Sequence, residues 1–393
     1  MDELIKKIQS KRVYAVQTPI IPTITQLARK HSGTISLGQG VAYYGPPQQA
    51  YDEIQKQLNS NKLNAYGPVE GIPELTQTLA EKLHARNNIS INQKSKVFVT
   101  AGSNMAFSSL MVAIADPGDE IILLTPYYFN HEMAIRLADA TPVLVPTLDN
   151  YHPDIDHIKS TITNKTRAIV TVSPNNPTGA VYTQEELTAI NQLCAKHGIY
   201  HISDEAYEDF LYEDRKHFSP ASLNNSEAHT ISLYSLSKAY GFAGWRVGYM
   251  VIPSQMFASL RKVQDTVLIS PTIISQYAAH GAHRAPYSYI ENHLKEIEKS
   301  RDVCLEHINQ TNLLKTPAVS EGAFYIFIKL NTKKDDFTIA KQLIEKFGVA
   351  TIPGSAFEAS NGAYLRISYG ALTSATVKQG IEKLTAGLQI LLI

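Results

Sequence analysis

The sequence SLSKAYGFAGWRVGY, residues 235–249, decides how the rest of the chain is interpreted. It places Lys238 eight positions before Arg246 in a stretch that also contains three glycines. Three glycines disfavour a helix, because each costs about 1 kcal/mol relative to alanine in a helix interior. The apolar runs at 230–234 and 247–252 on either side predict short buried strands. We therefore predict a shaped loop with Lys238 at the end of a strand.

The residues around Lys238 suit a cofactor that carries both an aldehyde and a phosphate. A lysine amine can bond covalently to an aldehyde, and Ser235, Ser237 and Arg246 lie close enough in sequence to hold a phosphate. Pyridoxal 5′-phosphate has both groups, so we predict that it is the cofactor. Taken alone, the motif fits solvated surface charges around a glycine-rich turn better, but further motifs outweigh that alternative.

Length and composition limit the class of protein. At 393 residues the chain exceeds the usual size of one hydrophobic core, so two domains are expected. Lys plus Arg and Asp plus Glu number 36 each, which leaves no net charge to attract nucleic acid or an anionic membrane. A small-molecule substrate is therefore expected.

The cysteines and the first residues indicate a cytoplasmic protein. Cys194 and Cys304 do not have the spacing of metal ligands, so no metal site is predicted, and two isolated thiols fit a reducing compartment. The stretch MDELIKKIQSKRVYAV at 1–16 has acidic residues and no apolar signal segment. Nowhere does an apolar run approach the roughly 20 residues of a membrane span.

From residue 96 onward, apolar runs alternate with helical patterns. Such alternation predicts an α/β fold with a mostly parallel sheet and crossover helices. We predict an N-terminal arm at 1–45 that joins the small domain, a large cofactor-binding domain at 46–285 and a small α+β domain at 286–393. A long charged amphipathic pattern at 287–308 predicts a helix that links the two domains.

Polar motifs follow the predicted strands, and ligands of parallel sheets bind beyond the carboxyl ends of the strands. In VTAGSNMAF, residues 99–107, the amides of Gly102, Ser103 and Asn104 are expected to be free to bind an anion at the start of a helix. In TPYYFNHE, Tyr128 is expected to cover a flat pyridine ring, whereas Tyr127 is expected to pack in the core.

Two further strand ends carry an amide and a carboxylate. SPNNPTG presents Asn176 between two prolines, where its side chain can donate to a phenolate oxygen. SDEAYEDF places Asp204 at a strand end, where a carboxylate can keep a pyridine nitrogen protonated, and Tyr207 three residues later. In AYLRISYG, Arg366 lies among apolar residues and needs a fixed anion. That anion is either a substrate α-carboxylate or the partner in an internal salt bridge.

Together these motifs resemble the class I/II aminotransferases of the fold type I pyridoxal-phosphate-dependent enzymes, from Ile35 to Tyr369. The resemblance implies that Lys238 forms the Schiff base and moves the proton between the substrate Cα and the cofactor. It also implies roles for the other motif residues. Asp204 pairs with the pyridine nitrogen, Asn176 and Tyr207 bind the phenolate oxygen, Tyr128 stacks on the ring, Gly102, Ser103, Asn104, Ser235, Ser237 and Arg246 bind the phosphate, Arg366 grips the substrate carboxylate with Asn176 nearby, and Gly40 lines the substrate entrance.

The resemblance also predicts a homodimer with shared active sites. Tyr66 matches the family's tyrosine that reaches the phosphate of the neighbouring subunit. The stretches at 38–47 and 262–276 are similar to a plant subgroup that transaminates aromatic amino acids with methionine as a donor. Asn104 stands where some aspartate-specific relatives have a lysine, which makes strict aspartate specificity doubtful.

The expected activity is transfer of an amino group between an L-amino acid and a 2-oxo acid. Aromatic residues or methionine are the favoured substrates, and glutamate or aspartate remain possible. The same fold supports other reactions, so a C–S β-lyase is the alternative enzyme. A ligand-sensing regulator would need a DNA-binding domain, for which the stretch before Ile35 is too short. A dinucleotide-binding protein is disfavoured because GFAGWRVG has the wrong glycine spacing.

Overall fold

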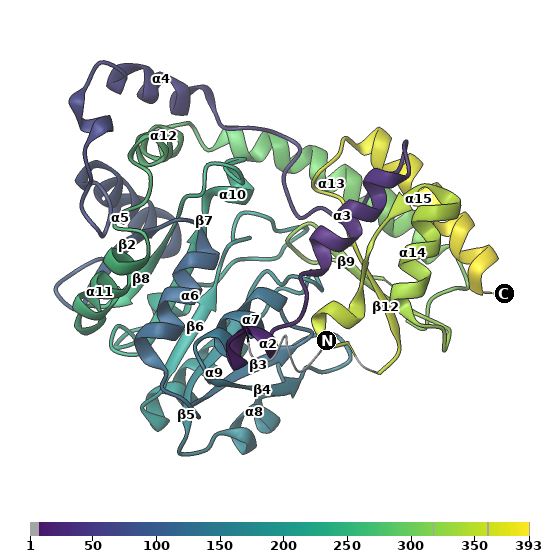
Figure 1. Ribbon diagram of the computed structural model, residues 1–393, viewed down its shortest axis with the longest axis horizontal. Coiled ribbons are helices and arrows are strands. Elements are labelled where there is room, and N and C mark those ends of the chain that lie inside the picture. Colours follow the sequence, from purple (N-terminus) through teal and green to yellow (C-terminus); the bar gives the residue numbers. More distant parts are fainter. Residues whose placement is uncertain (1–7, 317, 360, 393) are drawn as a thin grey trace.

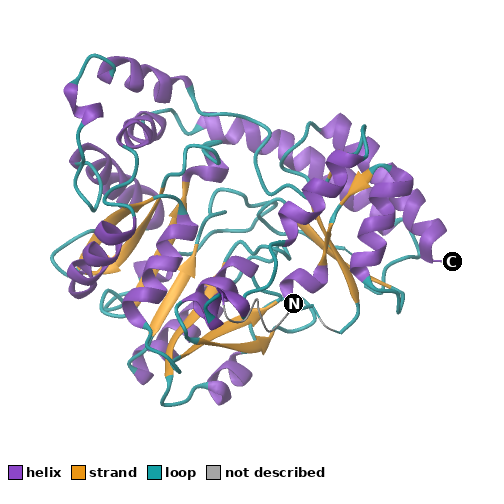
Figure 2. Cartoon of the chain, viewed as in Figure 1, coloured by secondary structure: helices purple, strands orange, loops and turns teal. Residues whose placement is uncertain are grey.

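The computed structural model describes residues 8–316, 318–359 and 361–392. These residues form two parts, a larger one built on a twisted sheet and a smaller one that also contains helices and a sheet (Figures 1 and 2). The N-terminal arm predicted at 1–45 lies partly outside the described residues, and within it Lys11–Tyr14 forms the helix α2. No helix formed by the described residues is both long enough and apolar enough to cross a membrane.

The larger part contains a seven-stranded sheet in the order β2-β8-β7-β6-β5-β3-β4. Its strands are β2 (Ser95–Thr100), β3 (Glu120–Thr125), β4 (Thr141–Pro146), β5 (Thr166–Val172), β6 (Tyr200–Asp204), β7 (Thr230–Ser235) and β8 (Gly248–Pro253). Only β8 runs antiparallel to its neighbours. The prediction of a mostly parallel sheet is therefore confirmed.

Helices cover both faces of this sheet, because successive side chains of a buried strand point to opposite sides. Ile121 and Leu123 of β3 pack in the main core with Phe107, whereas Ile122 packs in a second core with Ile190. The helices of this part follow in chain order. They are α4 (Gln48–Gln57), α5 (Pro73–Asn87), α6 (Ser103–Ile114), α7 (Phe129–Leu137), α8 (Ile155–Thr161), α9 (Gln184–His197), α10 (Leu236–Ala239), α11 (Phe257–Val267) and α12 (Ile273–His283).

The smaller part is formed by an N-terminal segment, residues 20–36, together with the C-terminal part of the chain. Helix α13 (Ser288–Asn309) runs toward it from the larger part, as the amphipathic pattern predicted (Figure 1). Its other elements are α3 (Ile20–Lys30), β1 (Ile35–Ser36), β9 (Tyr325–Leu330), α14 (Asp336–Phe347), β10 (Val349–Ala350), β11 (Ile352–Pro353), β12 (Ala363–Ser368) and α15 (Ser374–Leu392). Strands β11, β12 and β9 form an antiparallel sheet, and β1 pairs with β10 in parallel.

The loop at 235–249 contains one helical turn, which was not predicted. The hydroxyl of Ser235 accepts a hydrogen bond from the backbone N–H of Ser237 and so caps the first turn of α10. Gly241 has a φ of +66°, and a Cβ there would lie 2.5 Å from the carbonyl oxygen of Tyr44. Glycine therefore ends the turn where the chain passes close to another backbone.

Candidate active site

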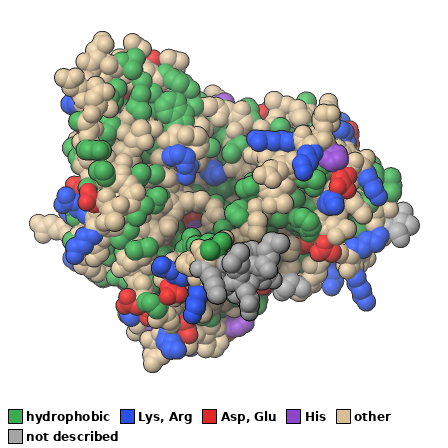
Figure 3. All heavy atoms as spheres, in the orientation of Figure 1, with side chains coloured by type: hydrophobic (Ala, Val, Ile, Leu, Met, Phe, Trp, Pro, Cys, Tyr) green, Lys and Arg blue, Asp and Glu red, His purple; other side chains and the backbone are tan. Residues whose placement is uncertain are grey.

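A cavity lies beyond the carboxyl ends of the parallel strands. Figure 3 shows this face of the molecule hollowed between the two parts. The residues that line the cavity are Ser103, Asn104, Tyr128, Val172, Asn176, Asp204, Ala206, Tyr207, Ser235, Ser237, Lys238 and Arg246. Motifs from five separate stretches of the chain are thus brought together, as parallel strands require. Of the other residues that the sequence singled out, Gly102, Gly40 and Arg366 adjoin this lining, and Tyr66 does not.

Lys238 is held with its amine inside the site. It lies on α10, directly after β7, and its Nζ donates a 2.6 Å hydrogen bond to the carbonyl oxygen of Gly40. Burial, together with the charges of Arg366 and Arg246, lowers the pKa of Lys238 to about 8, against the opposing effect of Asp204. A sizeable fraction of the amine is therefore neutral, and hence nucleophilic, near neutral pH.

The start of α6 and Arg246 form the anion-binding end of the cavity. A Cβ on Gly102 would lie 2.3 Å from Nη2 of Arg246, so glycine is needed for the guanidinium to sit there. Arg246 also donates to the hydroxyl of Ser237 at 3.4 Å. The amides of Ser103 and Asn104 belong to the first turn of α6, whose N–H groups have no intrahelical acceptor.

One detail of the predicted anion site is wrong. The backbone N–H of Gly102 donates a 2.8 Å hydrogen bond to the carbonyl oxygen of Thr100, so it is not free for an anion. This bond closes a three-residue turn centred on Ala101. Gly102 contributes space for Arg246 instead of a donor.

Asp204 ends β6 and is oriented from two sides. Its Oδ1 accepts a 3.1 Å hydrogen bond from the backbone N–H of Ala206, and its Oδ2 lies 3.1 Å from Nε2 of His131. The ring of His131 stacks on Phe107 with centroids 4.0 Å apart. The sequence analysis missed His131, although it lies one helical turn after Tyr128 in the same motif.

Tyr207 faces a second tyrosine that the sequence analysis also missed. The hydroxyls of Tyr207 and Tyr325 are 2.7 Å apart, and Nζ of Lys238 lies 5.5 Å from the centre of the Tyr207 ring. A Cβ on Gly40 would lie 2.4 Å from the hydroxyl of Tyr325, so Gly40 leaves room for that ring. Tyr325 comes from β9 in the smaller part, and the apolar strand pattern gave no sign of this contact.

Arg366 is buried and has no acidic partner among the described residues. Its Nη1 donates to Oδ1 of Asn176 at 2.9 Å, and its Nη2 donates to the carbonyl oxygen of Gly38 at 2.8 Å. Its Nε has no hydrogen-bond partner within the part of the chain that the structure describes. The rings of Tyr325 and Phe357 lie 4.6 and 5.0 Å from the guanidinium carbon. A buried cation without a counter-ion is poised to bind a carboxylate, so the alternative of an internal salt bridge is wrong.

Tyr127 and Tyr128 lie in the two environments expected from the sequence. Tyr127 is buried in the core, whereas Tyr128 is half-buried in the cavity lining, and its hydroxyl accepts a 2.7 Å hydrogen bond from Asn130. Tyr66 is 83% exposed and lies in the loop before α5. Within one chain it cannot complete this cavity, because it points into solvent.

The donor set fits pyridoxal 5′-phosphate. A partly neutral lysine suits the aldehyde, a helix start with Arg246 suits the phosphate, and an oriented carboxylate suits the pyridine nitrogen. Asn176 and Tyr207, which line the same cavity, would donate to the ring oxygen. A parallel sheet with these groups at its carboxyl edge defines a fold type I pyridoxal-phosphate-dependent enzyme.

Comparison with known proteins gives the family. Residues 32–384 match the aminotransferase class I and II family, and the chain belongs to it. It is 33% identical to the aromatic aminotransferase ISS1 of Arabidopsis thaliana over 98% of this chain and 97% of that protein. The chain is therefore an aminotransferase, and its cofactor is pyridoxal 5′-phosphate.

Solved structures agree with this assignment. The aromatic aminotransferase of Pyrococcus horikoshii OT3 superimposes with a TM-score of 0.86 at 33% identity, covering 93% of this chain and 99% of that one. A single mutant of Thermus thermophilus aspartate aminotransferase gives a TM-score of 0.87 at 33% identity, covering 96% and 99%.

Proposed function

We propose that this aminotransferase acts on aromatic L-amino acids or methionine and uses a 2-oxo acid as the acceptor, with glutamate or aspartate as slower substrates. Among its relatives are enzymes named for aromatic substrates and enzymes named for aspartate, so the side-chain preference must be argued from the site.

The distribution of cations carries the proposal. Among the described residues, the cations at the cavity are Lys238, Arg246 and Arg366. Lys238 is assigned to the cofactor's aldehyde, Arg246 to its phosphate and Arg366 to the substrate's α-carboxylate. None is left for the second carboxylate of aspartate, and Asn104 at the start of α6 is uncharged. The rings of Tyr325 and Phe357 beside Arg366 favour an apolar or aromatic side chain instead.

The residues of the chain divide the work of the reaction. When bound, pyridoxal 5′-phosphate supplies an electron sink for the bonds at the substrate Cα. Lys238 moves the proton to and from that carbon, which its lowered pKa of about 8 permits near neutral pH. Asp204 holds the proton on the pyridine nitrogen, with His131 keeping the carboxylate in place. Arg366 orients the substrate through its α-carboxylate.

We further infer a homodimer in which Tyr66 serves the active site of the partner subunit. The support is the exposure of this aromatic side chain, which no contact with the described residues explains. A cytoplasmic location, expected from the sequence, stays a prediction.

Substrate preference is tested by turnover with single amino acids. The purified holoenzyme is mixed with each of the twenty amino acids and with 2-oxoglutarate, pyruvate or oxaloacetate in turn, and the new amino acid is quantified. We expect kcat/KM for phenylalanine, tyrosine or methionine to exceed that for aspartate by about tenfold, equivalent to about 1.4 kcal/mol. A higher kcat/KM for aspartate than for all three would refute the proposal.

A further inference from the structure

The loop that carries Asp204 and Tyr207 also carries three acidic residues that the reaction does not use. Glu205, Glu208 and Asp209 alternate with the site residues in SDEAYEDF. The side chains of Glu208 and Asp209 are only 13% and 4% exposed, and Glu205 is fully enclosed. Buried carboxylates need partners, so the loop must be held by charges from other elements.

Glu205 pairs with His217 at 2.8 Å, and two cations one helical turn apart on α5 are the partners of Glu208 and Asp209. Lys82 forms an ion pair with Glu208, and Arg86 forms one with the adjacent Asp209. Lys82 is itself almost fully buried, with a side chain 7% exposed. Residues four apart lie on the same face of a helix, so a single face of α5 grips both carboxylates.

Further contacts fix the geometry of the Lys82–Glu208 pair. The side-chain amide of Asn87 donates to Glu208 at 2.6 Å and accepts from Nζ of Lys82 at 2.9 Å. Burial alone would raise the pKa of Glu208, but Lys82, His217 and Arg86 outweigh it and hold the pKa below its usual value. The carboxylate is therefore ionised in its buried position.

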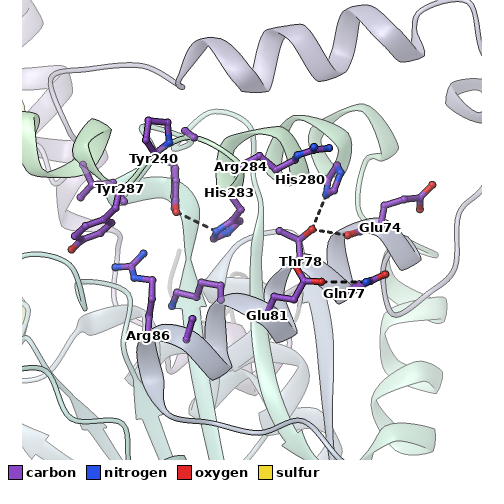
Figure 4. A pocket seen from close by; sticks show the side chains of 15 residues that line it. Glu74, Gln77, Thr78, Glu81, Arg86, Tyr240, His280, His283, Arg284 and Tyr287 are labelled. Carbon is purple, nitrogen blue, oxygen red and sulfur yellow. Dashed lines mark hydrogen bonds between the residues drawn. The ribbon is translucent and has the colours of Figure 1, made fainter.

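Arg86 also contacts Tyr287, which directly precedes α13. Its guanidinium carbon lies 4.2 Å from the centre of the Tyr287 ring, and the Tyr287 hydroxyl donates to Asp209 at 3.3 Å. Figure 4 shows Arg86 rising from α5 toward Tyr287 at one end of a second cavity of about 580 Å³. The Tyr240 hydroxyl meets Nδ1 of His283 in the same cavity, at 3.2 Å.

Tyr207 immediately precedes the two clamped residues. Its hydroxyl is 2.7 Å from that of Tyr325, and its carbonyl oxygen accepts from the backbone N–H of Phe210 at 2.9 Å. The loop is thus one tight turn, with the phenol on the cofactor side and the carboxylates on the α5 side. A shift of Glu208 would move the phenol with it.

We propose that Lys82 and Arg86 are positioning residues: by clamping Glu208 and Asp209 onto α5, they fix the phenol of Tyr207 against the cofactor. The proposal rests on the proposed role of Tyr207 as a hydrogen-bond donor to the cofactor's phenolate oxygen. It assigns a function in the reaction to two residues that lie outside the cavity lining.

The pH dependence of the cofactor's near-visible absorbance tests the proposal without substrate. A donor to the phenolate oxygen stabilises the deprotonated cofactor. Loss of that donor therefore raises the spectral pKa, which is the cofactor pKa read from the absorbance. We expect the holoenzyme variants Lys82→Met and Arg86→Met to raise it by about 0.5 unit or more, which is about threefold in the protonation equilibrium. Tyr207→Phe should raise it further, and adding Lys82→Met to Tyr207→Phe should cause no additional shift.

Matched variants separate positioning from stability. Lys82→Arg keeps the charge and should restore the wild-type spectral pKa. Arg167→Met removes an ion pair with Asp119 elsewhere in the same part and should leave it unchanged. If Lys82→Met does not fold, Lys82→Met combined with Glu208→Gln removes both buried charges and should still show the shift.

Three results would overturn the proposal. If Tyr207→Phe shifts the spectral pKa and the clamp variants lower Tm without shifting it, the clamp is only structural. If the double variant of Lys82→Met and Tyr207→Phe shifts the spectral pKa by the sum of the two single shifts, Lys82 affects the cofactor by a route other than Tyr207. If Tyr207→Phe itself causes no shift, the role of Tyr207 fails and the clamp fails with it. Because no substrate is used, each result is independent of the proposed substrate preference.

Discussion

At the scale of the residue, Lys238 shows how the fold changes the chemistry of one side chain. At its ordinary pKa of about 10.4, roughly one amine in a few thousand is neutral at pH 7, whereas at about 8 roughly one in ten is. Burial beside two guanidinium groups thus raises the fraction of nucleophile by more than about a hundredfold.

The first prediction follows from that shift. Below its pKa Lys238 is protonated, so the rate at which apoenzyme recombines with pyridoxal 5′-phosphate should rise about tenfold per pH unit up to about pH 8 and then level off. The rate is measured from the growth of the near-visible absorbance after mixing. Free Nα-acetyl-lysine is the control, and its rate should keep rising to about pH 10. A continued tenfold rise of the enzyme's rate beyond pH 9 would contradict the lowered pKa.

His131 gives a second prediction at this scale. His131→Phe keeps a ring to stack on Phe107 but removes the polar nitrogen that lies 3.1 Å from Oδ2 of Asp204. Hydrogen bonds to charged groups contribute about 1.5–3 kcal/mol, so kcat should fall about 10- to 150-fold. Saturating steady-state kinetics measure the loss. His157→Phe, at an exposed position on α8, is the control and should retain full turnover. Turnover within a factor of about two of wild type in His131→Phe would show that Asp204 needs no support.

At the scale of the element, the start of α6 depends on one glycine. A methyl group on Gly102 would clash with Arg246, and its φ of +83° disfavours any other residue. Gly118 has a similar φ of +89°, but a Cβ there meets nothing within 4 Å. Both Gly102→Ala and Gly118→Ala should lose about 1–2 kcal/mol of stability from backbone strain.

Only the first substitution should weaken cofactor binding. Gly102→Ala displaces the guanidinium from the anion site, so the Kd for pyridoxal 5′-phosphate should rise about tenfold or more, since hydrogen bonds to charged groups contribute about 1.5–3 kcal/mol. Equilibrium dialysis measures the Kd, and chemical unfolding measures stability. Equal affinities in the two variants would show that Arg246 does not bind the phosphate from this position.

The elements also show what a sequence can predict. The strands were predicted closely because apolar runs such as the one in β5 end at polar motifs, and parallel strands bring those motifs to one edge. Helix α3 was not predicted because Pro22 interrupts its pattern, although proline is tolerated in a first turn. Tyr325 was missed because its partner, Tyr207, lies far away in sequence and in the other part of the molecule. Whether Arg366 contacts a carboxylate could not be predicted either, because its neighbours Asn176 and Gly38 lie far away in sequence.

At the scale of the whole molecule, Tyr66 is the predicted site residue that lies away from the cavity of its own chain. Its loop is anchored, because the carbonyl oxygen of Glu70 accepts from Val99 at 2.9 Å and the side chain of Gln276 accepts from Ile72 at 2.8 Å. The tyrosine ring is nevertheless 83% exposed. A firmly held loop that presents an aromatic side chain to solvent is what a shared active site requires.

Mixed dimers test this arrangement directly. Tyr66→Ala and Lys238→Ala each impair both sites of their own dimer if Tyr66 acts on the partner. After the two variants are unfolded together at equal concentration and refolded, random pairing makes about half of the molecules mixed dimers. Each mixed dimer contains one site with an intact Lys238 and an intact Tyr66, so activity should recover to about a quarter of wild type. If Tyr66 served its own chain, no intact site could form, and the mixture would have only half the activity of Tyr66→Ala alone.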